Sequence, residues 1–315
     1  MTTAVLLSPN PLQEEGTAVR TLLPFVLGTA QFGLDYGVAN RDGRVAPAAA
    51  AEILALAKRS GISILDTAPS YGVAENVLGQ LAGDDRDFDF ITKTLPAGSE
   101  SVDGEALARI ERAFADSLHI LRRERVAGIL VHHAEDLLKP GGELLVEQLQ
   151  TWQDKGLVGK IGVSVYERAE LEAIFERYPL NLVQLPLNVF DQRLHSEGVL
   201  AELNRRGVEI HVRSVFLQGL LLMDEALLPA YFTPWQNHVR RFHEACRETG
   251  ATPLAACLAF VRRLCGVTGI VTGVVSVAQL QQCLDAWQQD VLLDWSAFAV
   301  RDPGLVDPRR WPARS

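Results

Sequence analysis

Four side chains that can exchange protons follow three short apolar segments of this 315-residue chain. Asp66 and Tyr71 come at and after the end of one segment, and Lys93 and His132 each end a later one. A phenol beside an ammonium can give a proton to a carbonyl that receives hydride, because the cation favours the phenolate left behind. A carboxylate can hold that ammonium, and an imidazole can bind the carbonyl oxygen. Together these residue types point to carbonyl reduction.

Each of the four residues also has a purely structural interpretation. An aspartate after a strand often caps a turn, and Tyr71 before a glycine could simply cover a loop. His132 is followed by His133, and adjacent strand residues point to opposite faces, so one of the two is expected to pack elsewhere. Lys93 is harder to explain in this way, since an ammonium within an apolar strand needs a partner. The joint occurrence in three consecutive segments favours a common site.

The elements that must position these residues alternate between strands and helices. Apolar runs, continuous as in parallel strands buried on both faces, predict strands at 25–30, 62–68, 88–94, 126–132, 160–165, 182–187, 209–215 and 269–273. Helical spacing, with prolines at first turns and glycines after last turns, predicts helices at 47–60, 103–122, 143–155, 168–177, 196–206, 234–249 and 253–264.

This order predicts an α/β protein, a single (β/α)8 TIM barrel. We expect one domain over residues 1–315, with a barrel core at about 25–290, an N-terminal lead at 1–24 and a C-terminal tail at 291–315. An open doubly wound sheet is the alternative. Gly33 and Gly37 after the first strand are too far apart for a dinucleotide-binding fingerprint, and no phosphate-binding Walker loop occurs.

Composition limits the classes of partner. A net charge of −9 excludes a typical basic nucleic-acid surface, and no apolar run is long enough for a membrane span. The four cysteines form no CxxC pair and no histidine cluster accompanies them, so we expect no metal site and reduced thiols, with Cys257 and Cys265 in the core. Without a signal-peptide pattern the expected location is cytoplasmic. The sequence leaves the oligomeric state open.

The motifs resemble those of the aldo-keto reductase superfamily from about Leu27 to Ala286. The segment from Leu65 to Gly72, followed by Glu75-Asn76-Val77-Leu78-Gly79, is similar to the family's Asp-to-Tyr signature. Ile91-Thr92-Lys93 resembles its lysine strand and Leu130-Val131-His132 its histidine strand, which favours His132 over His133. Lys160 to Ser164 and Val183-Gln184 resemble the next two strands.

The resemblance implies a cofactor and a set of residues that bind it. It implies NADPH across the barrel mouth, with NADH possible, and hydride transfer to an aldehyde, ketone or sugar-like carbonyl with Tyr71 as the acid. The small-molecule carbonyl substrate is not otherwise identified. The implied cofactor-binding residues are Gly28, Thr29, Ser164, Gln184, Arg213, Ser214, Leu217, Gly219, Ser276 and Gln279.

The chain departs from the family pattern at several of these places. Val165 stands where an asparagine is usual, Arg213 where an aromatic residue is common, and Val275 and Gln282-Cys283 where a basic residue and a Glu-Asn pair are common. Few cations remain for a 2′-phosphate, which leaves the preference between NADPH and NADH open, although Arg213 could meet a phosphate. Arg193 could contact an anionic substrate, or be an ordinary surface arginine.

Three other functions remain compatible with these residues. The barrel could be a non-catalytic or regulatory subunit, or it could use bound nicotinamide for an isomerisation or elimination. A Schiff base on Lys93 is the third, and it is disfavoured because Asp66 would raise the lysine pKa.

Overall fold

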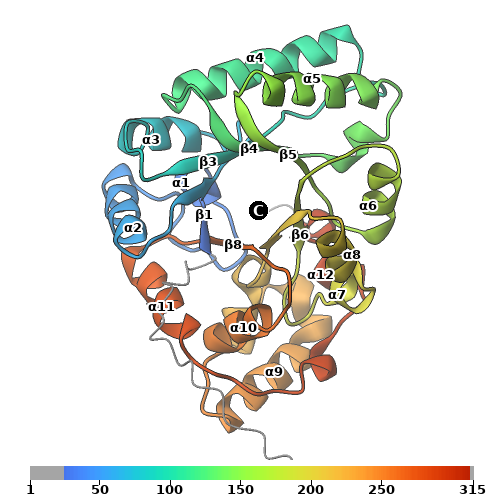
Figure 1. Cartoon of the computed structure of the whole chain (residues 1–315). Coiled ribbons are helices and arrows are strands. Elements are labelled where there is room, and N and C mark those ends of the chain that lie inside the picture. Colours follow the sequence, from blue (N-terminus) through green and yellow to red (C-terminus); the bar gives the residue numbers. More distant parts are fainter. Residues whose placement is uncertain (1–24, 313–315) are drawn as a thin grey trace, which may run out of the picture.

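In this computed structural model, which describes residues 25–312, eight parallel strands form a closed barrel (Figure 1). Neighbouring strands pair in chain order, and β1 closes the barrel against β8. The strands are β1 (Phe25–Gly28), β2 (Ile64–Asp66), β3 (Asp89–Lys93), β4 (Val126–Val131), β5 (Val158–Ser164), β6 (Leu182–Pro186), β7 (Glu209–Arg213) and β8 (Gly269–Gly273). The predicted barrel is confirmed, and every predicted strand overlaps an observed one.

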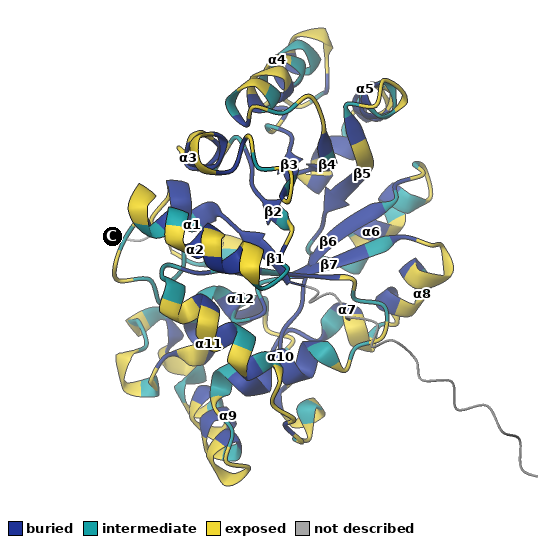
Figure 2. Ribbon diagram, turned by 60° about the vertical axis from the view of Figure 1, so that its left-hand side comes forward, coloured by how far each residue is buried: buried dark blue, intermediate teal, exposed yellow. Residues whose placement is uncertain are grey.

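Helices surround the barrel (Figure 2). They are α1 (Ala30–Gly33), α2 (Pro47–Arg59), α3 (Ala74–Leu81), α4 (Gly104–Ile120), α5 (Gly142–Asp154), α6 (Arg168–Phe175), α7 (Arg193–Ser196), α8 (Val199–Arg205), α9 (Gln236–Glu248), α10 (Pro253–Arg262), α11 (Val277–Trp287) and α12 (Pro303–Val306). Short 3-10 helices are η1 (Ala134–Leu137), η2 (Leu217–Leu222), η3 (Glu225–Leu227), η4 (Ala230–Trp235), η5 (Trp295–Phe298) and η6 (Pro308–Arg310).

Local sequence explains several helix ends. Pro47 begins α2, where its missing N–H costs nothing, and basic residues in the last turn face the negative end of the helix dipole. Asp103 caps α4 by accepting from the N–H of Ala106 at 2.8 Å. At α6 the N-cap Glu167 and Glu170, three residues later, form a capping box.

Two predicted helices were wrong at their boundaries, and four helices, the short α1 and α12 among them, were not predicted. The segment 196–206 forms parts of two helices, because Gly198 adopts a φ of 77° that an α-helix cannot contain. The helix predicted from Pro234 begins at Gln236, and Pro234 lies in η4. Helices α3 and α11 were missed as elements, although the family motif includes residues 75–79 of α3 and Gln279 of α11 was a predicted site residue.

Cysteines, groups that could bind a metal and helices that could span a membrane are described for residues 25–312. The four cysteines are free, and Cys265 is exposed rather than buried as expected, because it follows the end of α10. No group of metal-ligating side chains occurs within residues 25–312. No helix in the same range combines the length and apolarity needed to cross a bilayer.

The inside of the barrel is filled by a small apolar cluster directly beneath the candidate site. Ile91, Leu130 and Leu182 form this cluster, with Ile64 packed against it. Three of these side chains lie two residues before a site position on the same strand, Ile91 before Lys93, Leu182 before Gln184 and Ile64 before Asp66. Side chains two positions apart on a strand share a face, so the barrel interior supports the site from below.

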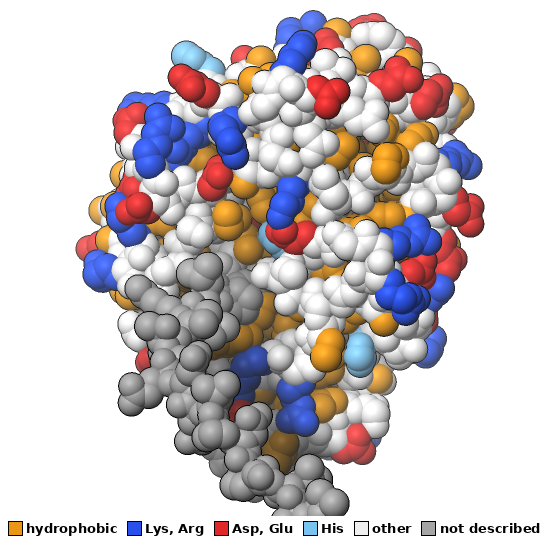
Figure 3. Space-filling model, viewed as in Figure 1, with side chains coloured by type: hydrophobic (Ala, Val, Ile, Leu, Met, Phe, Trp, Pro, Cys, Tyr) orange, Lys and Arg blue, Asp and Glu red, His pale blue; other side chains and the backbone are white. Residues whose placement is uncertain are grey.

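The C-terminal segment folds back onto the rest of the molecule as far as residue 312. Trp311 packs edge-to-face on Phe232 with ring centroids 4.9 Å apart, and Tyr231 donates from its hydroxyl to the carbonyl of Gly304 at 3.0 Å. In the face shown in Figure 3, charged side chains lie mainly around the rim and hydrophobic ones toward the middle. The N-terminal lead predicted at residues 1–24 lies outside the described residues.

Candidate active site

A buried ion pair lies at the ends of β2 and β3. Lys93 Nζ is 2.7 Å from Asp66 Oδ1, and the two side chains are 1% and 3% exposed. Lys93 also donates to the carbonyl of Thr67 at 2.9 Å, and Gln184 Nε2 donates to Asp66 Oδ2 at 2.9 Å. The predicted pairing of Asp66 with Lys93 is confirmed. Three strands therefore meet at one carboxylate.

Tyr71 and His132 lie above this pair and line a cavity of about 300 Å³. Lys93 Nζ is 4.9 Å from the centroid of the Tyr71 ring, and the rings of Tyr71 and His132 meet edge-to-face with centroids 5.9 Å apart. The four residues predicted from the sequence are thus brought together.

His133 shares this cavity, contrary to the expectation that the two histidines point to opposite faces. Strand β4 ends at Val131, so the alternation of strand side chains does not extend to His132 and His133. His133 lies nearer the rim, where its Nδ1 is 3.3 Å from Glu135 Oε1. His132 Nδ1 instead lies 3.3 Å from the hydroxyl of Ser70.

Burial is the largest influence on the pKa values of Tyr71, Lys93 and His132. It raises the pKa of Tyr71, and the charge of Asp66 raises it further, while Arg213 opposes both. The expected lowering of this pKa by Lys93 is therefore wrong, because the pKa is raised and Arg213 is the cation that opposes the rise. Burial lowers the pKa of Lys93 and Asp66 raises it. For His132, burial and then the charge of Lys93 lower the pKa to about 3, so the ring is neutral at pH 7.

The loop that carries Tyr71 is held by close backbone packing against α1. A Cβ added to Gly33 would lie 1.7 Å from the Tyr71 carbonyl oxygen. The same oxygen accepts from the N–H of Ala74 at 3.0 Å, which joins Tyr71 to the start of α3. Gly72 has a φ of 57°, so the chain turns directly after Tyr71 in a conformation that favours glycine. The backbone at Tyr71 is consequently held on both sides.

The arrangement of these residues agrees with the protein family that the sequence matches. The Aldo/keto reductase family matches residues 24–298. The chain belongs to this family. As an aldo-keto reductase it is an NAD(P)H-dependent oxidoreductase, and it acts on small-molecule carbonyl compounds. No protein of curated function matches the sequence significantly.

Solved structures of other aldo-keto reductases share the fold. AKR11C1 from Bacillus halodurans is 19% identical, with a TM-score of 0.69 over 87% of this chain and 90% of that one. The glycerol dehydrogenase AKR11B4 from Gluconobacter oxydans is 20% identical, with a TM-score of 0.64 over 93% of this chain and 94% of that one. A Pseudomonas aeruginosa aldo-keto reductase, PA4992, is 22% identical, with a TM-score of 0.62 over 84% of this chain and 90% of that one.

A second cavity, of about 510 Å³, extends from Asp66 and Tyr71 to the start of α11. Most of the residues predicted to bind a cofactor line it, namely Gly28, Thr29, Gln184, Arg213, Ser214, Gly219 and Gln279. Ser164 lines the smaller cavity beside His132. Leu217 is buried in the core and Ser276 caps α11, and neither is among the lining residues. A role for these two residues in cofactor binding stays a prediction.

The residues that line the larger cavity fit a nicotinamide dinucleotide in their chemistry. Thr272 lines it and has a buried hydroxyl without a hydrogen-bond partner among the described residues. Ser214, Leu217, Gln218 and Gly219 all have positive φ, so the loop after β7 makes a tight turn beneath the cavity. At Gly219 a Cβ would lie 2.5 Å from Ala39 Cβ. The far end opens at the N-terminus of α11, which suits a phosphate.

The structure shows the surroundings of Val165 and of the start of α11, two places where the chain departs from the family pattern. Val165 is fully buried, and its N–H donates to the carbonyl of Gln184 at 2.9 Å. Ser276 accepts from the N–H of Gln279, and the Gln279 side chain accepts from the N–H of Val275, so both side chains are engaged in capping α11.

Several lining residues were not identified from the sequence. Arg41, from the loop after α1, lines the larger cavity, and Tyr166 and Arg309 line the smaller one. Arg309 is distant in sequence from every other site residue, so no motif spacing pointed to it. Arg193 lines neither cavity and forms two hydrogen bonds to Asp191, at 2.8 and 3.0 Å. Substrate contact by Arg193 is therefore not supported.

Proposed function

We propose that the protein reduces an aldehyde, ketone or sugar-like carbonyl with Tyr71 as the proton donor. The observation that carries this proposal is the buried Asp66–Lys93 pair next to Tyr71, whose ring shares a cavity with His132. Such a group of residues has no evident structural need, since burying an ion pair rarely adds to stability.

Tyr71 is suited to hold a proton until the carbonyl oxygen requires it. Its pKa is raised by burial and by Asp66, so the phenol is protonated at neutral pH. When the phenol O–H bond breaks, its proton passes to the substrate oxygen and a phenolate remains. Lys93, 4.9 Å from the ring centroid and held by Asp66, offsets that negative charge. Asp66 in this scheme positions the lysine and does not itself exchange a proton.

His132 is suited to orient the carbonyl as a neutral donor. If the hydroxyl of Ser70 donates to Nδ1, the tautomer places the ring proton on Nε2. That N–H can donate to the substrate oxygen beside Tyr71. A neutral imidazole does not compete with the phenol as the acid, because its pKa is lowered to about 3.

A nicotinamide cofactor, when bound, supplies the hydride that the carbonyl carbon accepts. Gln184 reaches the cavity with its Nε2 already bonded to Asp66, which leaves its oxygen to accept from an amide such as the carboxamide. Ser164 stands next to it on β5. Gly28, Thr29, Ser214 and Gly219 would line the path of the cofactor, and Gln279 its adenosine end. We propose NADPH, with NADH as the alternative that binding decides. The predicted cytoplasmic location stays a prediction.

Substitution of Tyr71 by phenylalanine tests the proposal. We expect Tyr71→Phe to lower kcat for glyceraldehyde and 4-nitrobenzaldehyde by roughly 10²–10⁴-fold. Binding of NADPH and NADH, followed by tryptophan fluorescence, should stay within about twofold of the unmodified protein, because no acid is needed to bind. Tyr178→Phe is the matched control, since Tyr178 lies outside both cavities. A Tyr71→Phe protein that binds cofactor and retains most of its activity would exclude Tyr71 as the acid.

A further inference from the structure

Arg213 ends β7 at the wall shared by the two cavities. Its Nη2 donates to the carbonyl of Val165 at 3.2 Å, and its Nη1 is 3.5 Å from Ser214 Oγ. No carboxylate among residues 25–312 lies within ion-pair distance of this half-buried guanidinium. A partly desolvated charge without a counterion favours an anion as its partner.

The side chain of Arg213 is held in place by Tyr166. The guanidinium carbon lies 4.0 Å from the centroid of the Tyr166 ring, and that of Arg309 lies 3.8 Å from the same centroid. Two guanidinium groups at these distances would overlap on one face, so they flank opposite faces. Stacking on an aromatic ring fixes the plane of the guanidinium fork. The fork of Arg213 is therefore set beside the cavity before any ligand arrives.

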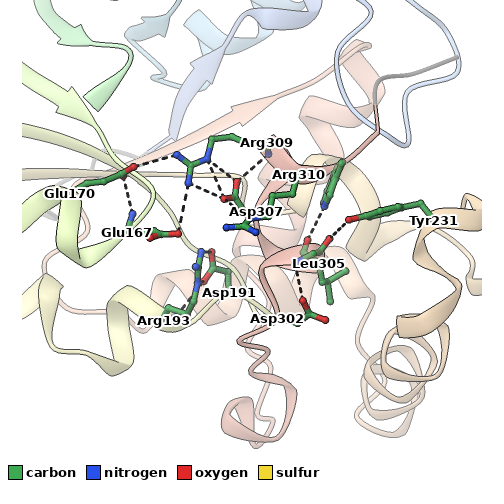
Figure 4. Close-up of polar contacts among 12 residues, drawn as sticks. Glu167, Glu170, Asp191, Arg193, Tyr231, Asp302, Leu305, Asp307, Arg309 and Arg310 are labelled. Atoms are coloured by element: carbon green, nitrogen blue, oxygen red, sulfur yellow. Dashed lines mark hydrogen bonds and ion pairs between the residues drawn. The ribbon is translucent and has the colours of Figure 1, made fainter. Parts of the chain in front are cut away.

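Arg309 has its charge balanced within the protein, unlike Arg213. It forms hydrogen bonds to both oxygens of Asp307, at 2.9 and 2.8 Å, and lies 3.3 Å from Glu170 and 3.9 Å from Glu167 (Figure 4). Asp307 itself is buried. Arg309 thus anchors the C-terminal segment to α6 and closes the far side of Tyr166.

The remaining charged groups around the smaller cavity are also paired. Glu170 is held by Arg309 and by the N–H groups that it caps, and Glu135 lies against His133 near the rim. His132 is neutral at pH 7. Arg213 is therefore the lining side chain best placed to attract an anion into the cavity that holds Tyr71.

We propose that the substrate is a carbonyl compound with a carboxylate, and that Arg213 binds this carboxylate. The inference rests on the proposed function, because it places the carbonyl at Tyr71 and His132 in the same cavity of about 300 Å³. A guanidinium fork matches a carboxylate in geometry and gives a charge-assisted pair of hydrogen bonds. A free carboxylate at a fixed distance from the carbonyl would then align the substrate for reduction.

A phosphate of the cofactor is the other candidate partner for Arg213. The direction of the side chain argues against it. The guanidinium extends from β7 toward Val165 and Tyr166 at the end of β5, whereas the predicted phosphate path runs toward α11. Arg41 lines the larger cavity and offers a cation on that side.

Matched acid and ester substrates test the inference. Succinic semialdehyde would be compared with its methyl ester, and 4-carboxybenzaldehyde with methyl 4-formylbenzoate, as ratios of kcat/KM with saturating NADPH. We expect the unmodified protein to prefer each acid. Arg213→Gln should lower the acid-to-ester ratio roughly tenfold to a hundredfold, the loss expected for hydrogen bonds to a charged group. Arg213→Lys should restore part of that ratio.

Arg193→Gln is the matched control, because this half-buried arginine is paired with Asp191 outside the cavities. It should leave the acid-to-ester ratio unchanged. Cofactor binding would be measured on all variants by fluorescence titration. A fall in NADPH affinity in Arg213→Gln with no change in the ratio would assign Arg213 to the cofactor and overturn the inference.

Binding of an acid and its ester, neither of which carries an aldehyde or ketone to be reduced, separates this inference from the proposed function. 4-Methylbenzoate and methyl 4-methylbenzoate would be titrated into the protein–NADPH complex by calorimetry. Tighter binding of the acid, lost in Arg213→Gln, supports the anion site even if no test aldehyde is reduced, and the lack of turnover then counts against the proposed function alone. Equal binding of acid and ester overturns the inference, whatever the turnover. Stronger competition by benzyl phosphate than by 4-methylbenzoate would replace the carboxylate with a phosphate.

Discussion

Removing the charge of Asp66 should destabilise the protein far more than removing a surface charge. In Asp66→Asn the Lys93 ammonium keeps only neutral acceptors, such as the carbonyl of Thr67, and loses its counterion in a position that is 1% exposed. Breaking one side of a buried ion pair in this way costs about 3–5 kcal/mol of unfolding free energy, because an uncompensated charge stays behind. Replacing both partners, in Asp66→Asn with Lys93→Met, should cost less than Asp66→Asn alone.

Urea unfolding, followed by circular dichroism and tryptophan fluorescence, gives the four free energies of this double-mutant cycle. We expect a coupling energy above about 2 kcal/mol between Asp66 and Lys93. Asp84→Asn is the control, because its pair with Arg122 is exposed and should contribute less than about 1 kcal/mol. Additive effects of the two substitutions at Asp66 and Lys93 would refute the reasoning, since they would show that the pair does not act as a unit.

The pH dependence of the Asp66→Asn variant gives a second check. Burial already lowers the pKa of Lys93, and Asp66 is the largest influence that raises it. Without Asp66 the folded-state pKa of Lys93 falls further below its unfolded value, so the variant becomes more stable as pH rises and Lys93 loses its proton. The stability deficit should therefore be smaller at pH 9 than at pH 7. A deficit that is constant or grows with pH would contradict this.

Three further predictions concern single residues. His132 should remain a neutral imidazole from pH 8 down to about pH 4, since its pKa is lowered to about 3, and its ring ¹⁵N shifts should show this; a titration near pH 6.5 would contradict the burial argument. Glu75 is buried and its pKa is raised, so it lowers stability as pH rises through its folded-state pKa; Glu75→Gln should flatten that slope in urea unfolding, and an unchanged slope would exclude Glu75 as its cause. Gly33→Ala should displace Tyr71, because the new Cβ would lie 1.7 Å from the Tyr71 carbonyl oxygen, and should cost about 1–3 kcal/mol and most of kcat; normal kinetics would show that the loop adapts freely.

The sequence by itself determined the fold and the four central residues. Eight apolar runs, most of them separated by helical patterns, predict a closed barrel, because parallel strands need both faces covered. Strand ends in a barrel meet at one mouth, so Asp66, Lys93 and His132 could be placed together from their positions in three runs.

The sequence alone did not predict where some helices begin and end, or the direction in which the pKa of Tyr71 is shifted. Gly198 divides one predicted helix in two through its positive φ, a choice that any glycine leaves open until packing decides it. The pKa of Tyr71 depends on how deeply the ring is buried and on nearby charges. The predicted lowering of this pKa by Lys93 was wrong, because burial and the charge of Asp66 raise the pKa and Arg213 opposes them.

Only the tertiary structure decided which cations reach the mouth of the barrel. Arg193 and Arg213 are both arginines near strand ends, yet Arg193 is paired with Asp191 and Arg213 faces the cavity of Tyr71. Arg309 enters from the C-terminal segment, which the sequence left undetermined, because Asp307 and Glu170 fix it over Tyr166. Short-range patterns specify strands and helices, whereas the partner of a long charged side chain depends on contacts between segments far apart in the chain.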